Sequence, residues 1–480
     1  MQLPLLKMEK KCLILSVALL CISPLSVSAS SSPPSNGRAI FQQAPDSVSG
    51  GSSLQPHAAT PNDDVTLHGE QRLQTDKYIF GSRRGYFHAS LDLSLEYTDN
   101  LYNVNRDWPK NDITHKHYDH QDNILTQLAP TIWLALPRRY RVPVHISSHN
   151  TSPGGLQFTQ PDNRFFNKYQ LYLSGGLNFK NFSENSELNH TDVKLEGLFQ
   201  YNPKQNLTFQ VTDQYVNNQD LFDISNATEN NQRVYDSNLF IGGVDWQPLN
   251  KLSVKLDYTN FALKYDDTTN DFLNRTDNGL DLHLFYDYSP KTNMFFQYRY
   301  FYASFDGNDQ LENGNVYLYL GVNWRYTVKT TFLAKIGYQA VDYDNEAYDD
   351  PSGALTFEIQ ANWKMTAKTS FLLDATYSYE QTDSVTALNK RVFVARIGYE
   401  QQFTDRLRGA VNFIYENSDY EQLDGYPRED DRYFFKPELQ YAFRKWLHGE
   451  LSYSFDTRDS SREELDYKTN NVKLGLNISF

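Results

Sequence analysis

Charged and aromatic residues that recur at alternate positions are the side chains with the most chemistry to offer. We predict that a set of charged residues lines the lumen of a barrel: Arg299, Lys335, Asp374, Arg396, Glu400, Arg408, Glu438 and Glu450. Four aromatic residues in the same alternation are candidates for stacking on sugar rings: Tyr172, Phe295, Tyr317 and Tyr319. Such a wall could form an ion-selective or saccharide-conducting track, or a self-neutralising network that stiffens the protein.

Two short motifs offer other chemistry. "HISSHN", His145–Asn150, contains a Ser and a His that could act in hydrolysis, with Ser148 as the candidate nucleophile. "HKHYDH", His115–His120, could bind a transition metal, but a loop without a rigid scaffold holds three His in poor geometry. Closeness in sequence is not a geometric test, so we predict no enzyme, no resident metal and no cofactor.

The N-terminus has the features of a secretory signal peptide over residues 1–29. Lysines precede the apolar run Cys12–Leu20, and small residues at Val27 and Ala29 predict cleavage after Ala29. Both cysteines of the chain lie in this signal, so the mature protein has no disulfide. Residues 30–84, rich in Ser, Pro and Gly, are predicted to be a mostly disordered periplasmic extension. The formal net charge of −14 argues against a nucleic-acid partner.

The elements that would position the charged residues are strands. From residue 85 to residue 480, apolar and polar residues alternate. This alternation explains why the whole chain is polar, with a mean hydropathy of −0.64, although 15% of its residues are aromatic. The typical predicted length of ten or eleven residues suits a tilted strand crossing a bilayer. The first strand is "YFHASLDLSLEYTDNLY", and the others span roughly 123–136, 168–180, 191–201, 205–215, 234–246, 251–261, 279–288, 292–302, 315–325, 330–340, 353–363, 370–380, 391–401, 406–416, 432–442, 446–456 and 470–480.

The connections between these strands alternate between short turns and long polar loops. "SPKTN" and "TVKT" are examples of the first kind, and "YDDTTNDFLNRTD" and "NSDYEQLDGYPREDD" of the second. This alternation is typical of bacterial outer-membrane barrels, whose short turns face the periplasm. Aromatic residues are expected at both interfaces. Those at the short turns are Tyr201, Trp246, Tyr288, Trp324, Trp363, Phe403, Phe443 and Trp446, and those near the long loops are Tyr97, Tyr302, Tyr338, Tyr379, Tyr415 and Phe455.

The C-terminal "NVKLGLNISF" keeps the period of two to the last residue. A terminal strand of this kind must be paired and half buried along its whole length, which predicts that it closes the barrel. Its apolar residues Leu476, Ile478 and Phe480 resemble the signal by which the barrel assembly machinery recognises its substrates.

One stretch does not fit the pattern. Residues 137–167 occupy a place where a short turn is due, and a loop of this length is either functional or a sign of a wrong assignment. It could be a periplasmic insertion, a plug folded into the lumen, or an unrecognised hairpin.

The first hairpin, "LEYTDNLYNV" (Leu95–Val104), resembles that of a large family of β-barrel porins whose members often accompany exopolysaccharide synthesis. The resemblance in strand rhythm extends over most of residues 85–480, with Tyr97–Leu101 as its local motif. It implies an outer-membrane channel, and no functional residue is carried over from it.

Together these features predict an all-β, up-and-down antiparallel transmembrane β-barrel of about eighteen strands in the bacterial outer membrane. The predicted function is a porin-like channel, with exopolysaccharide export or saccharide passage through a polar, charged lumen. The alternatives are a closed surface barrel that binds or anchors polysaccharide, and an outer-membrane hydrolase. Expected partners are outer-membrane lipid, lipopolysaccharide, the barrel assembly machinery and a polysaccharide.

Overall fold

The computed structural model describes residues 87–105, 121–136, 145–146, 158–159, 168–204, 206–220, 233–266, 268–306, 311–345, 352–381, 387–422, 427–444 and 446–479. The chain divides into two compact units, Met1–Ile40 and Phe41–Phe480, and every described residue belongs to the second. The predicted signal peptide, the predicted extension 30–84, the "HKHYDH" motif and Phe480 lie outside the described residues.

Long strands make up the wall of the molecule. They are β1 (Phe87–Thr98), β2 (Asn123–Leu136), β5 (Tyr169–Phe182), β6 (His190–Lys204), β7 (Leu207–Asp220), β8 (Arg233–Leu249), β9 (Leu252–Tyr265), β10 (Arg275–Ser289), β11 (Thr292–Phe305), β12 (Asn313–Thr327), β13 (Thr330–Tyr343), β14 (Ser352–Trp363), β15 (Thr369–Gln381), β16 (Ala387–Gln402), β17 (Leu407–Gln422), β18 (Arg428–Arg444), β19 (Leu447–Ser460) and β20 (Tyr467–Ser479). Short 3-10 helices lie in the connections: η2 (Ser186–Leu188), η4 (Thr268–Leu273) and η7 (Glu463–Leu465).

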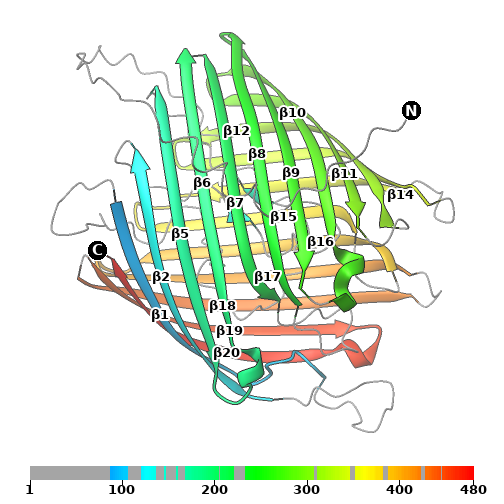
Figure 1. Ribbon diagram of the computed structural model, residues 1–480. Helices are drawn as coiled ribbons and strands as arrows, with labels where there is room; N and C mark the ends of the chain where they lie inside the picture. Colours follow the sequence, from blue (N-terminus) through cyan, green and yellow to red (C-terminus); the bar gives the residue numbers. More distant parts are fainter. Residues whose placement is uncertain are drawn as a thin grey trace, which may run out of the picture. The chain divides into compact units, whose positions relative to one another are not determined.

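These strands form one closed, 18-stranded antiparallel sheet. Each wall strand pairs with the next along the chain, and β20 pairs with β1 from Ser479↔Ser90 to Asn471↔Thr98. Figure 1 shows β20, in red, beside β1, in blue, where the wall closes. The predicted up-and-down barrel is therefore confirmed, and so is the role of the last strand in closing it.

The period of two in the sequence sorts side chains between the two faces of the wall. On β20, Val472, Leu474 and Leu476 are exposed on the outer face, whereas Asn471 and Lys473, which alternate with them, are buried on the inner face. A charge on the outer face near the membrane midplane would cost about 2–4 kcal/mol, which explains why the charged residues of this strand's centre point inward.

Exposed aromatic residues surround the barrel near the short turns. All those predicted there are exposed, and Trp246, Trp324 and Trp363 are examples. Near the long loops, Tyr97 and Tyr338 are exposed, and the hydroxyl of Tyr302 donates to Asp344 at 2.7 Å. Tyr379 is an exception, because it is only 4% exposed and packs with Val341 and Tyr343 inside the wall. Its predicted place in the outer belt is wrong.

The strands extend further than predicted at their long-loop ends. β10 begins at Arg275 where 279 was predicted, and β18 begins at Arg428, so that "REDD" belongs to a strand instead of a loop. Beyond the membrane both faces of a strand can be polar, so the alternation that marks a strand in the sequence fades before the strand ends.

The contact between β14 and β15 is shorter than its neighbours. Its ladder runs only from Trp363↔Phe371 to Phe357↔Tyr377, whereas the β13–β14 ladder continues to Val341↔Ser352. Beyond Phe357↔Tyr377, the side chain of Gln339 on β13 forms hydrogen bonds with the backbone of β15. Its oxygen accepts from the N–H of Tyr379 at 3.2 Å, and its amide donates to the Tyr379 carbonyl. The outer end of β15 thus leans inward, which explains the position of Tyr379.

Within residues 137–167, only two short strands belong to the described part of the chain. β3 (His145–Ile146) and β4 (Phe158–Thr159) pair antiparallel as a separate two-stranded sheet. None of the helices in the described ranges is long and apolar enough to cross a membrane.

Candidate functional site

The inner face of β9–β19 is rich in charged side chains, and we call it the charged wall. Every charged residue predicted to line the lumen lies on strands β11 to β19 at a position that points inward. Residues directly opposite each other on paired strands can interact, so the register between strands decides which charged side chains meet. Their role in conduction stays a prediction.

Asp281 is the centre of one part of the charged wall. Its carboxylate accepts from Arg299 Nε at 2.5 Å and from the Gln297 amide at 3.1 Å, and it lies 3.2 Å from His283 Nδ1. On the adjacent strand, Asp257 pairs in register with Asp281 and forms an ion pair of 3.0 Å with Lys255. The predicted residue Arg299 is therefore held in place by a buried carboxylate.

Lys335 and Glu358 form a second ion pair, with 2.8 Å between Nζ and Oε2. The ammonium group also lies 4.8 Å from the ring centroid of Tyr319, which gives it a cation–π contact. Both side chains are largely buried, so this pair is screened less by salt than a surface pair would be.

The other predicted charged residues continue the network around the wall. Asp374 faces Arg396 across β15 and β16, and Arg408 donates to Glu400. Lys436 lies 3.7 Å from Glu438, which also accepts from Gln440. Glu450 faces Gln440 in register on β19. Positive and negative side chains thus lie close together along the inner face, with partners from the neighbouring strand, as for Arg408 and Glu400, or from the same strand, as for Lys436 and Glu438.

An arginine cluster at the long-loop end of β18–β20 was not predicted from the sequence. Arg432 binds Asp456 through two hydrogen bonds of 2.8 and 2.5 Å, and Arg428 binds Asp430 at 2.7 Å with its guanidinium carbon 4.0 Å from the Tyr420 ring centroid. The signal was present, because Arg428, Asp430 and Arg432 continue the alternation of the strand. Reading "REDD" as a loop concealed it.

The aromatic residues predicted to stack on sugars also point inward, but three of them are covered. Tyr172, Phe295 and Tyr319 are between 6 and 7% exposed. Phe295 packs against Phe285 and Leu333, and it faces Gly321 in register, where a Cβ atom would meet its ring. Tyr317 is half-buried and lies edge-on to Phe301. Sugar stacking by these rings stays a prediction, and their present contacts are with the protein.

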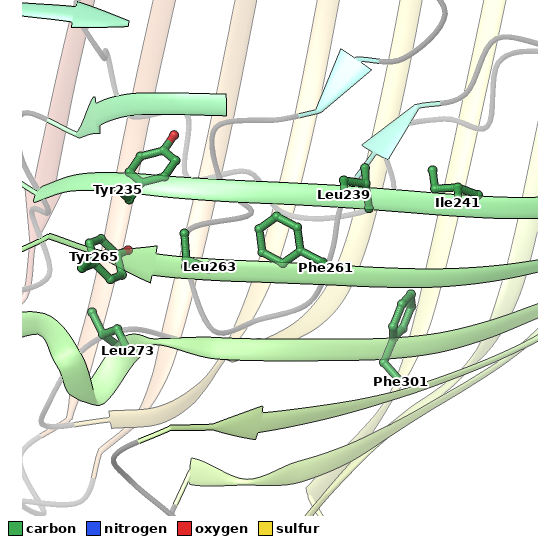
Figure 2. Packing of buried hydrophobic residues seen from close by; sticks show 8 residues of the cluster. All are labelled: Tyr235, Leu239, Ile241, Phe261, Leu263, Tyr265, Leu273 and Phe301. Atoms are coloured by element: carbon green, nitrogen blue, oxygen red, sulfur yellow. The ribbon is translucent and has the colours of Figure 1, made fainter. Parts of the chain in front are cut away.

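The inner faces of β7 and β8 differ from the charged wall, and we call them the neutral wall. Thr212 and Gln214 lie on β7, opposite Ile241 and Leu239 of β8. An apolar cluster continues from here across the wall: Tyr235, Leu239, Ile241, Phe261, Leu263, Tyr265, Leu273 and Phe301. Figure 2 shows these side chains on neighbouring elements, with Leu273 on η4 beside the strands. Leu239 and Ile241 are 0% exposed, so neighbouring residues cover both side chains completely.

Outside the spanning strands, one carboxyl group at the long-loop end has an altered acidity. Burial raises the pKa of Asp466, although the backbone N–H of Ser460 donates to it at 2.7 Å and lowers the pKa. The group follows η7 and connects the loop to the end of β19.

An apolar outer face, two aromatic belts and a polar inner face define a transmembrane β-barrel. The family model described as "Putative beta-barrel porin 2" matches residues 164–480, and the chain belongs to this family. It is a porin-like barrel of the bacterial outer membrane. This confirms the family predicted from the first hairpin and the predicted location.

Solved structures match this chain at low similarity. Acinetobacter baumannii OccAB4 is 12% identical with a TM-score of 0.44, and the match covers 83% of this chain and 99% of that chain. Pseudomonas aeruginosa OccK5 (OpdH) is 11% identical with a TM-score of 0.43, covering 82% and 98%. The outer membrane protein opdK from Pseudomonas aeruginosa is 12% identical with a TM-score of 0.44, covering 82% and 99%. At these values nothing about solutes is carried over. A comparison with curated proteins gives no match.

The stretch predicted as a candidate hydrolase site is described only in part. Of His145–Asn150, the backbone of β3 is described, and Ser148 lies outside the described residues. A catalytic role for this stretch therefore stays a prediction, and the candidate functional site is the inner face of the barrel wall.

Proposed function

We propose that this porin-like barrel conducts hydrophilic solutes along its charged wall, with an exopolysaccharide or its fragments as the dedicated cargo. The observation that carries the proposal is the series of inward-facing ion pairs from Lys255 on β9, through Lys335 and Glu358, to Arg408 on β17. Ions and sugars need polar partners when they leave bulk water, and this network supplies donors and acceptors of both kinds.

Conductance in a planar bilayer is the first test. We expect the refolded protein to give discrete ion-conducting steps, and vesicles containing it to swell in solutions of small neutral sugars. Swelling that falls off with sugar size would support a saccharide path. The absence of both conductance and swelling, from protein whose mobility on a gel shifts on heating as expected for a folded barrel, would overturn the channel proposal.

The pair Lys335–Glu358 allows a sharper test because its charges can be removed singly. Glu358→Gln leaves the ammonium group of Lys335 unbalanced, so we expect ion selectivity to shift toward anions. Lys335→Met leaves the carboxylate and should shift selectivity toward cations. The double variant restores neutrality and serves as the control. Equal selectivity in all three conducting variants would place the pair off the ion path.

The place of residues 137–167, in the lumen or in the periplasm, stays a prediction. Deletion of residues 138–166 tests it in the same bilayer assay. Conductance that appears or increases on deletion would favour a plug, whereas unchanged conductance would favour a periplasmic loop.

One observation favours the second candidate function, a closed surface barrel that binds or anchors polysaccharide. Leu239 and Ile241 point inward on β8 and yet are 0% exposed. Inner-wall residues of a wide water-filled channel would contact solvent, so this burial favours a filled interior at that level. Saturable binding of polysaccharide to a protein that conducts no ions would select this candidate.

A further inference from the structure

Every short turn of the barrel that the structure describes has a Lys or an Arg within it or on the last residues of the strand that leads into it. We call these cations the turn ring: Lys204 at the end of β6, Lys251 between β8 and β9, Lys291 between β10 and β11, Arg325 near the end of β12, Lys329 between β12 and β13, Lys364 and Lys368 between β14 and β15, Arg406 between β16 and β17, and Arg444 at the end of β18. The pattern recurs around the circumference and is not confined to one side.

The turn ring is not neutralised by acidic neighbours. Among the described residues of these turns, Asp405 is the one carboxylate. In the described part of the chain, Lys251, Lys291 and Lys364 form no ion pair, and Lys329 donates to the backbone carbonyl of Met365 in the next turn at 3.3 Å. Apart from Arg325, which is half-buried, the members of the ring are exposed. The positive charges of exposed members such as Lys251, Lys291, Lys364 and Lys368 are therefore available to an external partner.

Three cations of the turn ring directly follow an exposed aromatic residue of the short-turn belt. Trp324 directly precedes Arg325, Trp363 precedes Lys364, and Phe443 precedes Arg444. Aromatic belts mark the level of lipid headgroups, and long basic side chains beside them reach the phosphates. The turn ring therefore lies at the depth of the phosphate layer in the leaflet that the short turns face.

The opposite end of the barrel has the reverse character. There, outer-face tyrosines donate to acidic residues of the next strand: Tyr215 to Asp236 at 2.5 Å and Tyr415 to Asp431 at 2.7 Å. The contrast shows that a basic rim is a property of the short turns and not of both interfaces.

We propose that the turn ring binds the anionic phosphate headgroups of phospholipids in the periplasm-facing leaflet. A lipid surface surrounds the barrel, so it can contact cations on all of these turns at once. A soluble acidic protein would instead need a group of cations on one side. Each basic residue near an anionic lipid surface favours association by about fivefold.

The test compares lipid association in bilayers of two compositions. Full-length protein is refolded into vesicles of phosphatidylcholine alone and of phosphatidylcholine with a minor fraction of phosphatidylglycerol, and lipids retained by the barrel are counted by native mass spectrometry. We expect phosphatidylglycerol to be enriched several-fold over its bulk fraction, with the enrichment falling at high salt.

Variants locate the binding. The quadruple variant Lys251→Gln, Lys291→Gln, Lys364→Gln and Lys368→Gln should reduce the enrichment several-fold. The matched control Lys264→Gln and Lys468→Gln removes exposed cations at the opposite end of the barrel and should leave it unchanged. Heat-modified gel mobility verifies that both variants are folded. Enrichment that is absent in the wild type, or equal in both variants, would overturn the proposal.

Discussion

The charged wall and the neutral wall belong to one sheet, yet they are built on different principles. On β9–β19, inward charges form ion pairs with opposite charges, either on a neighbouring strand, as Lys335 does with Glu358, or on the same strand, as Lys255 does with Asp257. On β7 and β8, amides and hydroxyls lie beside an apolar cluster that includes Leu239 and Ile241. The first wall depends on pairing, whereas the second depends on packing. Removing one group should therefore have very different consequences in the two places.

The largest effect is expected from Asp456→Asn in the charged wall. Asp456 is fully buried and binds Arg432 through two hydrogen bonds, so the substitution leaves a buried guanidinium unpaired. We expect a loss of about 3–5 kcal/mol in the free energy of unfolding, measured by urea titration in lipid vesicles.

The matched control is Asp419→Asn, whose partner Arg391 is 54% exposed at a distance of 2.9 Å. A solvent-exposed pair contributes about 1 kcal/mol or less, so this variant should be close to wild type. Equal losses in the two variants would show that burial does not set the strength of pairing in this barrel.

A smaller effect on stability is expected at Gly321, where an aromatic ring packs against the charged wall. At Gly321, a Cβ atom would meet the ring of Phe295, whereas a Cβ at Gly475 would make only ordinary contacts. We expect Gly321→Ala to lower the free energy of unfolding by about 1–3 kcal/mol. Gly475→Ala, the control, should be neutral or slightly stabilising, because alanine loses less backbone freedom than glycine on folding. The reverse order in the same urea titration would contradict the proposed ring contact.

The smallest effect is expected in the neutral wall. The side-chain nitrogen of Gln210 is buried and has no hydrogen-bond partner among the described residues. Gln210→Leu removes this polar group without leaving a charge unpaired, so stability should change by no more than about 1 kcal/mol in either direction. A loss as large as that of Asp456→Asn would remove the distinction between the two walls.

The sequence predicted the wall well because a period of two is a local property. Each strand shows its two faces without reference to its neighbours, so the face that Arg299 and Lys335 share with other polar residues can be read from their own strands. The ends of the strands were placed less well, because the alternation fades where both faces are polar, as at Arg275 on β10.

The pairings of the site were beyond the sequence because they depend on register between strands. Nothing local indicates that the partner of Asp456 is Arg432, which is 24 residues away in the chain. The covering of Tyr319 by Lys335 and the inward lean of Tyr379 also arise from neighbouring strands. Alternation predicts which face a side chain occupies, but not how much of it neighbours cover.

The short ladder between β14 and β15 bears on how the barrel would come apart. Between most neighbouring strands, separation requires breaking a long row of backbone hydrogen bonds. The β14–β15 ladder ends at Phe357↔Tyr377, and beyond it the side chain of Gln339 forms hydrogen bonds with β15 instead. Separation of the strands should therefore start between β14 and β15. The backbone amides at the outer end of β15 should exchange with deuterium before those at the centre of the sheet, and the barrel, though closed, has a preferred place to open.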